Sequence, residues 1–311
     1  MKLHIFAFII ANTKLLCYNI IKRGLYWLKG GKMVLFSFDE HGFNIHHTLD
    51  EHPNEKLILM HAHTNCELYY LISGEGYYTV EGNTYNLSPG SILIMRDGET
   101  HKLHITDSMP YERIAVHFNP ETIPFESDRI SKLFYDRPLG KGNLIECSES
   151  SKKFIFSCFN RLCRATETNS TDRIFAYLIP ILYEISRPAK KEIIKSEGFD
   201  VPEKDSLLVV KIIEYINEHL TEIKGLAEIE QNFYFSASYL NKIFKQNTGS
   251  TIWNYIILKR LINAQNEIKN GKPAAVAAAV NGFGDYSSFY RLYKSHFGVS
   301  PASEKNFKTK K

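Results

Sequence analysis

Two segments near the carboxyl end carry hydroxyl, amide and basic side chains at spacings that could contact nucleic acid. The segment from Ser236 to Ser250 recurs in chemical type from Asp285 onward, without a gap. Each copy begins with a helix-capping residue, continues as a short helix with one polar and one apolar face, and ends at a glycine. A recognition helix is built in this way, so the repeat predicts a protein that contacts DNA at two points.

The polar faces of these two helices define the candidate DNA contacts. They are Ser238, Asn241, Lys242 and Lys245 in the first copy and Ser287, Ser288, Arg291 and Lys294 in the second. Residues at these spacings share one face of a helix. Hydroxyl and amide groups suit base edges, arginine can hold guanine with two hydrogen bonds, and lysine suits phosphates. A single such helix is typical of an ordinary protein surface, but the repetition favours DNA.

The opposite faces of the same helices are expected to be buried. They consist of Tyr239, Leu240, Ile243 and Phe244 in the first copy and Phe289, Leu292 and Tyr293 in the second. Ser236 and Asp285 are the predicted amino-terminal caps, because their side chains can accept hydrogen bonds from the first free backbone N–H groups of a helix.

The net charge of +4 is unevenly distributed. From Asn241 to Lys311 the chain has 12 Lys and Arg against 3 Asp and Glu, so the remainder is acidic. The basic charge therefore coincides with the repeat, although a charged run can also be only a solvated face.

Short strands are predicted from Leu57 to about His117. Hydrophobic residues alternate with period two, and glycine turns separate the runs, which is typical of an antiparallel barrel or sandwich.

Two amphipathic helices follow this region, between about Ser127 and Ser186. One apolar stripe contains Ile155, Phe159, Leu162 and Cys163, and the other contains Ile174, Leu178, Ile181, Leu182 and Ile185. These helices predict a hairpin that either packs on the sheet or forms a dimer interface.

The rest of the chain is predicted to be a linker and a small all-helical domain. Pro188, Gly198 and Pro202 indicate a linker over residues 187–205, and helical patterns fill 206–311. The expected helices are Leu207–Leu220, Leu226–Asn232, Ser238–Gln246, Ile252–Asn270, Pro273–Val280 and Tyr286–His296. We therefore expect an α+β protein with two domains, at 33–186 and 206–311.

Residues 1–32 are predicted to be an extension of little functional weight. Asn12 and Lys14 interrupt its apolar run well short of the roughly 20 residues that a membrane span needs. No cleavage site of the signal-peptide kind follows, and Met33 opens the sequence that resembles a domain. The five cysteines include no C-x-x-C pair, which favours a reducing compartment, and we expect a cytoplasmic protein without a membrane partner.

The carboxyl-terminal part resembles the DNA-binding domain of AraC-type transcription regulators. The resemblance lies in S-x-S-Y-L-x-x-I-F-K-x-x-T-G from Ser236 and in A-x-x-x-G-F-x-D-Y-S-S-F-x-R-x-Y-K-x-x-x-G-x-S-P up to Pro301. It implies two helix-turn-helix units joined by a long helix, here Ile252–Asn270. Glu230 departs from the family pattern, where a small residue usually packs, and Glu267 with Ile268 replaces a more apolar pair.

The amino-terminal part resembles the cupin barrel that is common in such regulators. His61-x-His63-x3-Glu67-x6-Gly74 and Gly90-x5-Arg96-x-Gly98-x2-His101 match its two motifs, although Arg96 replaces a proline and Ile105 replaces the final asparagine. The resemblance implies that His61, His63, Glu67 and His101 converge. Such a set binds Fe, Mn or Ni in cupin enzymes. It could equally hydrogen-bond the hydroxyls of an effector, or be only structural.

Four further histidines are expected to be exposed loop residues, because they lack regular spacing: His41, His46, His47 and His52. The sequence contains no phosphate-binding P-loop, no G-x-S-x-G and no Rossmann glycine motif, so nothing in it indicates an enzyme of those classes.

Together these features predict a transcription regulator that binds double-stranded DNA and responds to a small-molecule effector. A carbohydrate is the default effector, bound without a metal or other cofactor. We expect a homodimer, and the sequence leaves open whether RNA polymerase is a further partner. The alternatives are a metal-dependent cupin enzyme or metal sensor with an appended DNA-binding domain, and a constitutive DNA-binding protein whose barrel only dimerises.

Overall fold

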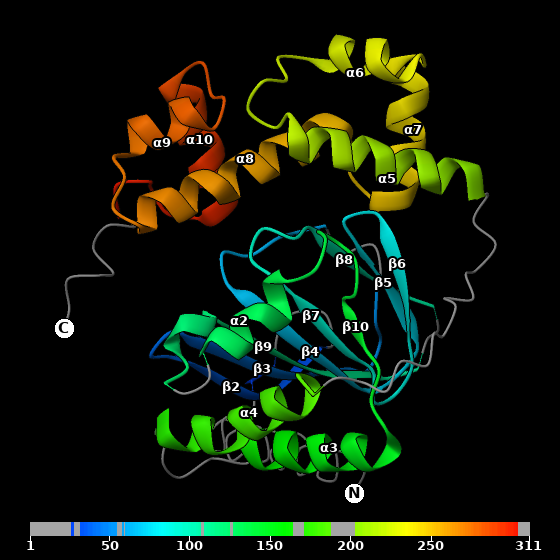
Figure 1. Cartoon of the computed structure of the whole chain (residues 1–311), viewed down its shortest axis with the longest axis vertical. Helices are drawn as coiled ribbons and strands as arrows, with labels where there is room; N and C mark the ends of the chain where they lie inside the picture. Colours follow the sequence, from blue (N-terminus) through cyan, green and yellow to red (C-terminus); the bar gives the residue numbers. More distant parts are fainter. Residues whose placement is uncertain are drawn as a thin grey trace, which may run out of the picture.

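The alternating hydrophobic residues of the amino-terminal half form two antiparallel sheets that face each other (Figure 1). This computed structural model describes residues 26–27, 32–54, 58, 60–106, 109–124, 127–163, 171–187 and 203–303. The larger sheet has the order β1-β2-β3-β9-β4-β7-β10 and the smaller one β6-β5-β8. The expected antiparallel barrel or sandwich, and the α+β class, are confirmed.

The strands of the larger sheet are β1 (Tyr26–Trp27), β2 (Lys32–Glu40), β3 (Phe43–Asp50), β4 (Cys66–Ser73), β7 (Ile92–Met95), β9 (Tyr111–Phe118) and β10 (Leu144–Ile145). Those of the smaller sheet are β5 (Gly76–Val80), β6 (Asn83–Leu87) and β8 (His101–Ile105). Of the predicted extension 1–32, the structure describes Tyr26, Trp27 and Lys32; Lys32 begins β2, and Tyr26 and Trp27 pair with Val34 and Met33 of that strand. The other residues of 1–31 lie outside the described residues.

A two-residue turn joins β5 to β6. Val80 pairs with Asn83, and the residues between them, Glu81 and Gly82, both have positive φ, at 45° and 80°. A type I′ hairpin turn requires positive φ at both positions. This turn places Glu81 at the end of the smaller sheet.

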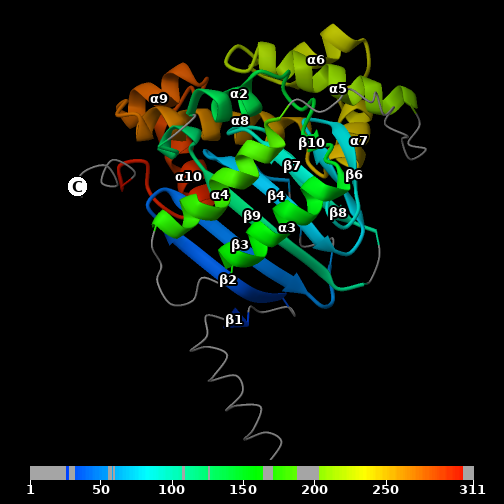
Figure 2. The ribbon, with the colours of Figure 1, turned by 60° about the horizontal axis from the view of Figure 1, so that its bottom comes forward.

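A helical hairpin covers the outer face of the larger sheet, as Figure 2 shows. It consists of α3 (Glu149–Cys163) and α4 (Thr171–Ile185), preceded by a 3-10 helix (Pro120–Thr122) and by α2 (Ser127–Tyr135). The predicted α4 stripe is buried in one core with residues of the sheet, and Leu178 has no exposed surface. The stripe therefore packs on the sheet, and its interpretation as a dimer interface is wrong.

The carboxyl-terminal half is helical, as predicted, and the expected boundaries agree within a few residues. The helices are α5 (Glu203–Glu218), α6 (Leu226–Phe233), α7 (Ala237–Thr248), α8 (Ile252–Lys269), α9 (Ala274–Val280) and α10 (Tyr286–Phe297). Helix α5 begins inside the predicted linker, whose residues 188–202 lie outside the described residues. No helix among the described residues is long and apolar enough to cross a membrane.

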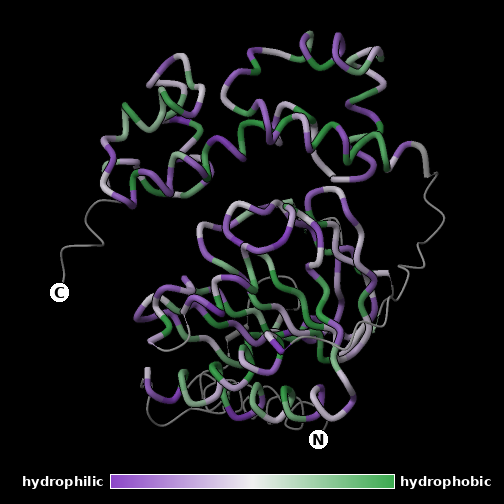
Figure 3. The backbone as a smooth tube through the Cα atoms, in the orientation of Figure 1, coloured by the Kyte–Doolittle hydropathy of each residue, from purple (hydrophilic) through white to green (hydrophobic). Residues whose placement is uncertain are grey.

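Helix α8 connects two small bundles, with α7 near one of its ends and α9 and α10 near the other (Figure 1). Figure 3 shows hydrophobic and hydrophilic residues alternating along α5 and α8. One core gathers residues of α5, α6, α7 and the start of α8, and a second gathers residues of α8, α9 and α10. The two copies of the repeat thus fold as two bundles that share one helix.

The two departures from the family pattern have local partners. Glu230 accepts a hydrogen bond from the backbone N–H of Ala237, at the start of α7. The Glu267 carboxylate accepts hydrogen bonds from Lys272 Nζ at 2.8 Å and from Asn281 Nδ2 at 3.1 Å. Each acidic side chain therefore forms hydrogen bonds between its own helix and the segment that follows it. These bonds replace the packing that a small or apolar residue would supply.

Candidate functional site

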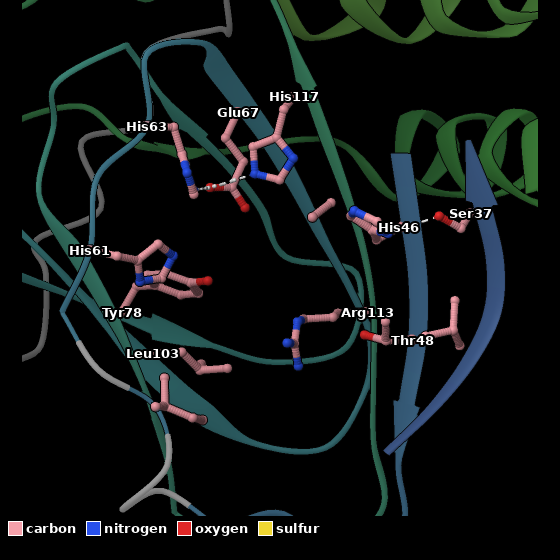
Figure 4. Close-up of a pocket in the computed structure, with 13 residues that line it drawn as sticks. Ser37, His46, Thr48, His61, His63, Glu67, Tyr78, Leu103, Arg113 and His117 are labelled. Carbon is pink, nitrogen blue, oxygen red and sulfur yellow. Dashed lines mark hydrogen bonds and ion pairs between the residues drawn. The ribbon is translucent and has the colours of Figure 1, made fainter. Parts of the chain in front are cut away.

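A cavity of about 490 Å³ lies between the two sheets (Figure 4). Its volume falls within the range of pockets for small molecules. The lining combines apolar and polar side chains: Val34, Ser37, His46, Thr48, Ile58, His61, His63, Glu67, Tyr78, Leu103, Arg113, Ala115 and His117. The structure brings the predicted His61, His63 and Glu67 to this wall, and the buried His101 lies against Glu67.

The carboxylate of Glu67 is the centre of a cluster of imidazoles. Its Oε2 atom lies 3.1 Å from His101 Nε2, 3.2 Å from His63 Nε2 and 3.5 Å from His117 Nε2. Glu67 comes from β4, His101 from β8 and His117 from β9, so the cluster spans both sheets. Only the tertiary fold brings these three strands to one place.

Burial and charge act in opposite directions on this cluster. Burial disfavours the ionised form of Glu67, but His117, His101 and His63 outweigh it and hold the Glu67 pKa well below its ordinary value. The pKa of His101 is raised, because hydrogen bonding to Glu67 and the charge of that carboxylate exceed the effect of burial. At His63 burial prevails and lowers the pKa. The ring Nδ1 of His101 also lies 2.8 Å from the Glu99 carbonyl oxygen.

Two sets of side chains in this cluster could hold a metal ion. They are His61 with His63 and His101, and His63 with Glu67 and His117, and within each set the ligand atoms lie within 4.8 Å of one another. Imidazole and carboxylate ligands suit divalent transition metals. The same atoms can also hydrogen-bond hydroxyl groups, since both imidazole and carboxylate accept such bonds.

Several lining residues were not expected from the sequence. His46 and His47 were predicted to lie in an exposed loop, but both belong to β3, where His46 lines the cavity and His47 lies 2.7 Å from Glu112. His117, Thr48 and Arg113 also belong to strands and to no motif. Successive side chains of a strand point to opposite faces of the sheet, so the alternation of residues along β3 and β9 was the one signal that could have shown which of these side chains face the cavity.

The eight candidate DNA contacts lie on α7 and α10, as predicted. Ser238, Lys242 and Lys245 on α7, and Ser287, Arg291 and Lys294 on α10, are exposed, and Asn241 and Ser288 are partly buried. Ser236 and Asp285 cap the two helices through their side chains, which confirms the predicted caps. Gly249 and Gly298 end the helices at φ values of 80° and 73°.

Three of the expected side-chain environments differ in detail. The Asn241 side-chain oxygen accepts a hydrogen bond from the backbone N–H of Ile252 at 3.1 Å, so it already helps to start α8. Tyr239 is 36% exposed and donates to Asp205 at 2.9 Å, and Leu292 is 39% exposed. The prediction that Tyr239 and Leu292 are buried is wrong, because each lies at the edge of its helix's apolar face.

The helical half contacts the wall of the cavity through a short segment before β4. His61 bonds to the backbone of His101 in both directions, at 3.0 Å and 2.8 Å. Its neighbours Met60 and Ala62 pack against the helical half, Ala62 in a cluster with Leu258 and Ile262 of α8.

The same segment ends in a polar contact with the far end of α8. Thr64 Oγ1 accepts a hydrogen bond from Lys269 Nζ at 2.7 Å. Residues 61 and 63 therefore line the cavity, and residues 60, 62 and 64 contact the helices.

A buried carboxylate joins the two halves beside this segment. Glu81, 2% exposed, receives Lys259 Nζ at 3.0 Å, Asn217 Nδ2 at 3.1 Å and the Tyr255 hydroxyl. From its own half it accepts the backbone N–H of Thr100 at 2.6 Å. Burial opposes its ionisation, but Lys259, Tyr255 and Thr100 outweigh that effect and lower the Glu81 pKa.

Comparisons with known proteins agree with this arrangement. The family described as the AraC-like ligand binding domain matches residues 48–178, and a helix-turn-helix domain family matches residues 231–306. The Msm operon regulatory protein of Streptococcus mutans is 23% identical over 76% of this chain and 83% of its own. The lactose operon transcription activator of Staphylococcus xylosus is 24% identical over 76% of this chain and 82% of its own.

Among solved structures, this chain is similar to ToxT of Vibrio cholerae. It is 13% identical, covers 88% of this chain and all of its own, and has a TM-score of 0.35.

The expected DNA contacts on α7 and α10 give different predictions for two substitutions. Arg291→Ala should weaken binding to the preferred duplex by about 1–3 kcal/mol and relax the preference at one or two base pairs. Lys245→Ala should weaken binding to all duplexes alike and reduce the salt slope by about one unit. Affinity measured against salt on specific and scrambled duplexes distinguishes them.

Lys132→Ala, an exposed lysine of α2, is the matched control for loss of one positive charge. It should leave the affinity unchanged. An equal loss on both duplexes for Arg291→Ala would show that Arg291 contacts phosphate. No effect of either substitution would contradict the placement of DNA on α7 and α10.

Proposed function

The chain belongs to the AraC-type transcription regulators, and from this premise we propose that a small polar effector binds in the cavity between the two sheets and thereby changes how α7 and α10 bind DNA. His61, His63, Glu67 and His101 are the proposed effector-binding residues. The proposed DNA contacts are the eight polar and basic residues of the two helices.

The single observation that supports this proposal is that one short segment, residues 60–64, contacts both the cavity and the helical half. His61 and His63 line the cavity, and Ala62 between them packs against Leu258 and Ile262 of α8. A ligand that moves either imidazole must shift backbone that α8 contacts. Because α8 joins both helix-turn-helix units, such a shift changes their placement against two successive segments of the major groove.

A carbohydrate is the proposed kind of effector. The Glu67 carboxylate and the imidazoles around it present acceptors and donors to the cavity, and sugar hydroxyls can use both. Apolar residues such as Val34, Ile58 and Leu103 complete the wall and can cover the C–H faces of a sugar ring. The name of the lactose operon activator, one of the relatives, is consistent with this class.

A metal is the second candidate ligand, because the two sets around Glu67 meet the requirements of a transition metal site. A metal sensor or a metal-dependent enzyme would then replace the sugar-responsive regulator. Relatives of this chain are transcription regulators, which supports a role without catalysis.

Substitutions in the cavity should separate effector response from DNA binding. His63→Ala or Glu67→Ala removes side chains that line the cavity but lie away from α7 and α10, so we expect loss of the response with DNA affinity within about twofold of the wild type. The measurement is DNA selection by the purified chain, repeated with a sugar library. A response that survives both changes would contradict the assignment of the cavity, and stoichiometric metal in protein purified without chelators would favour the second candidate.

The contact between the two halves can be tested without an effector. Lys259→Met leaves the buried Glu81 carboxylate without its cationic partner, and breaking a buried pair should lower the free energy of unfolding by about 3 kcal/mol. The control is Glu214→Gln, which breaks the exposed Lys141–Glu214 pair between the same halves and should cost less than about 1 kcal/mol. Equal effects of the two changes in urea unfolding would show that the halves do not dock in solution.

A homodimer is proposed through the outer face of α3. Phe154 and Phe156 of this helix are 46% and 44% exposed, and exposed aromatic side chains are typical of interfaces. Replacing both by serine should convert a dimer to a monomer in sedimentation velocity, whereas Val276→Ser, an exposed apolar residue of α9, should not. A dimer that persists after the double change would exclude this face.

The cytoplasm is the proposed location, because the described cysteines are unpaired. They are Cys66, Cys147, Cys158 and Cys163. Burial raises the pKa of Cys66 and of Cys163 to about 12 and that of Cys147 to about 11, so these thiols stay protonated and unreactive.

A further inference from the structure

The cavity contains a positive charge that no residue of the described chain neutralises directly. Arg113 of β9 lines the cavity, and Figure 4 shows its guanidinium directed inward, on a different side of the cavity from the Glu67 cluster. Among the described residues it forms no ion pair and no hydrogen bond. Its guanidinium lies near the Tyr111 ring, whose centroid is 5.9 Å from Cζ.

The carboxylate of the same cavity, Glu67, contacts histidines and forms no ion pair with Arg113. Glu67 lies within 3.5 Å of three imidazole nitrogens, so its negative charge is shared with histidines. The hydroxyl-bearing Tyr69, Tyr78 and Tyr111 surround Arg113, but they carry no charge at neutral pH, since burial raises the pKa of Tyr69 and of Tyr78 further. The Arg113 guanidinium is therefore available to a ligand, and its charge matches a ligand group with a single negative charge.

A second polar group without a partner lies beside Arg113. Thr48 of β3 is directly opposite Arg113 in the β3–β9 ladder, so both side chains point to the same face of the sheet. Thr48 is only 6% exposed, and its Oγ1 has no hydrogen-bond partner among the described residues. Buried hydroxyl groups are normally hydrogen-bonded, so an unpaired one beside a cavity is available to a ligand atom.

We propose that the effector is a sugar acid, with its carboxylate held by Arg113 and Thr48 and its hydroxyl groups by His61, His63, Glu67 and His117. This inference rests on the proposed function, because it takes the cavity as the effector site. A guanidinium and a hydroxyl donor can hold a planar carboxylate with charge-assisted hydrogen bonds. A phosphate dianion carries two negative charges, whereas Arg113 supplies one positive charge.

Matched pairs of acids and neutral sugars test the charge requirement directly. Glucuronate, galacturonate and gluconate are compared with glucose and galactose, and glucose 6-phosphate is added as the phosphate arm. Binding to the full chain is measured by thermal shift and titration calorimetry at constant ionic strength and without DNA. We expect at least one carboxylate to bind saturably and its neutral counterpart to bind at least about tenfold more weakly.

Substitutions then assign the carboxylate to its partners. Arg113→Gln should weaken binding of the acid by about tenfold or more and leave any weak binding of the neutral sugar unchanged. Thr48→Val keeps the shape of the side chain, removes the hydroxyl and should weaken binding by a smaller factor. Arg161→Gln, on the exposed face of α3, is the control for loss of an arginine and should have no effect.

Three outcomes would overturn the proposal: no carboxylate of the panel binds, neutral sugars or the phosphate bind as tightly, or Arg113→Gln retains full affinity for the acid. If Arg113→Gln does not fold, as judged by circular dichroism, Thr48→Val with the matched ligand pairs decides the question. Because binding is measured without DNA, an acid that binds but leaves DNA affinity unchanged contradicts only the proposed function. A neutral sugar that changes DNA affinity contradicts only the present inference.

Discussion

One buried carboxylate, Glu81, holds the two halves of this protein together. It lies in the turn between β5 and β6 and receives donors from Lys259, Tyr255 and Asn217 of the helical half, besides those of Thr100. A buried charge is tolerated only when it is paired and fully hydrogen-bonded, so the turn and the helices must keep their places together. The docking of the helical half on the sheets depends on this constraint.

The docking places α8 against backbone that directly adjoins residues of the cavity wall. The Thr100 backbone that binds Glu81 precedes His101, and His101 pairs with His61 across an isolated bridge. Lys259 also donates to the Gly98 carbonyl at 2.7 Å, and Gly98 in turn donates its N–H to the His63 carbonyl. The imidazoles that surround Glu67 and the helix that joins the two helical bundles thus belong to one continuous hydrogen-bonded region. The coupling that we propose between the cavity and DNA would pass through this region.

Local patterns predicted much of the fold. The helices of the carboxyl-terminal half, the caps at Ser236 and Asp285 and the antiparallel sheets follow from periodicity and capping, which depend on near neighbours along the chain. The motif histidines and Glu67 were predicted to converge through a family resemblance, and the structure brings them together. The errors concern single side chains. His46 and His47 lie in the middle of β3 and not in a loop, and His46 lines the cavity. Tyr239 and Leu292 are partly exposed at the edges of the apolar faces of their helices.

The sequence by itself therefore determined the order of the elements, the two-domain organisation and the polar faces of α7 and α10, because each arises from interactions over a few residues. Only the tertiary structure decided that Arg113 and Thr48 share a cavity with the Glu67 cluster and that Glu81 meets Lys259, which lies far along the chain. Those partners are set by strand pairing and by the docking of two halves, and neither leaves a periodic signal in the sequence. The charge of the cavity, on which the proposed class of effector rests, is therefore a property of the fold.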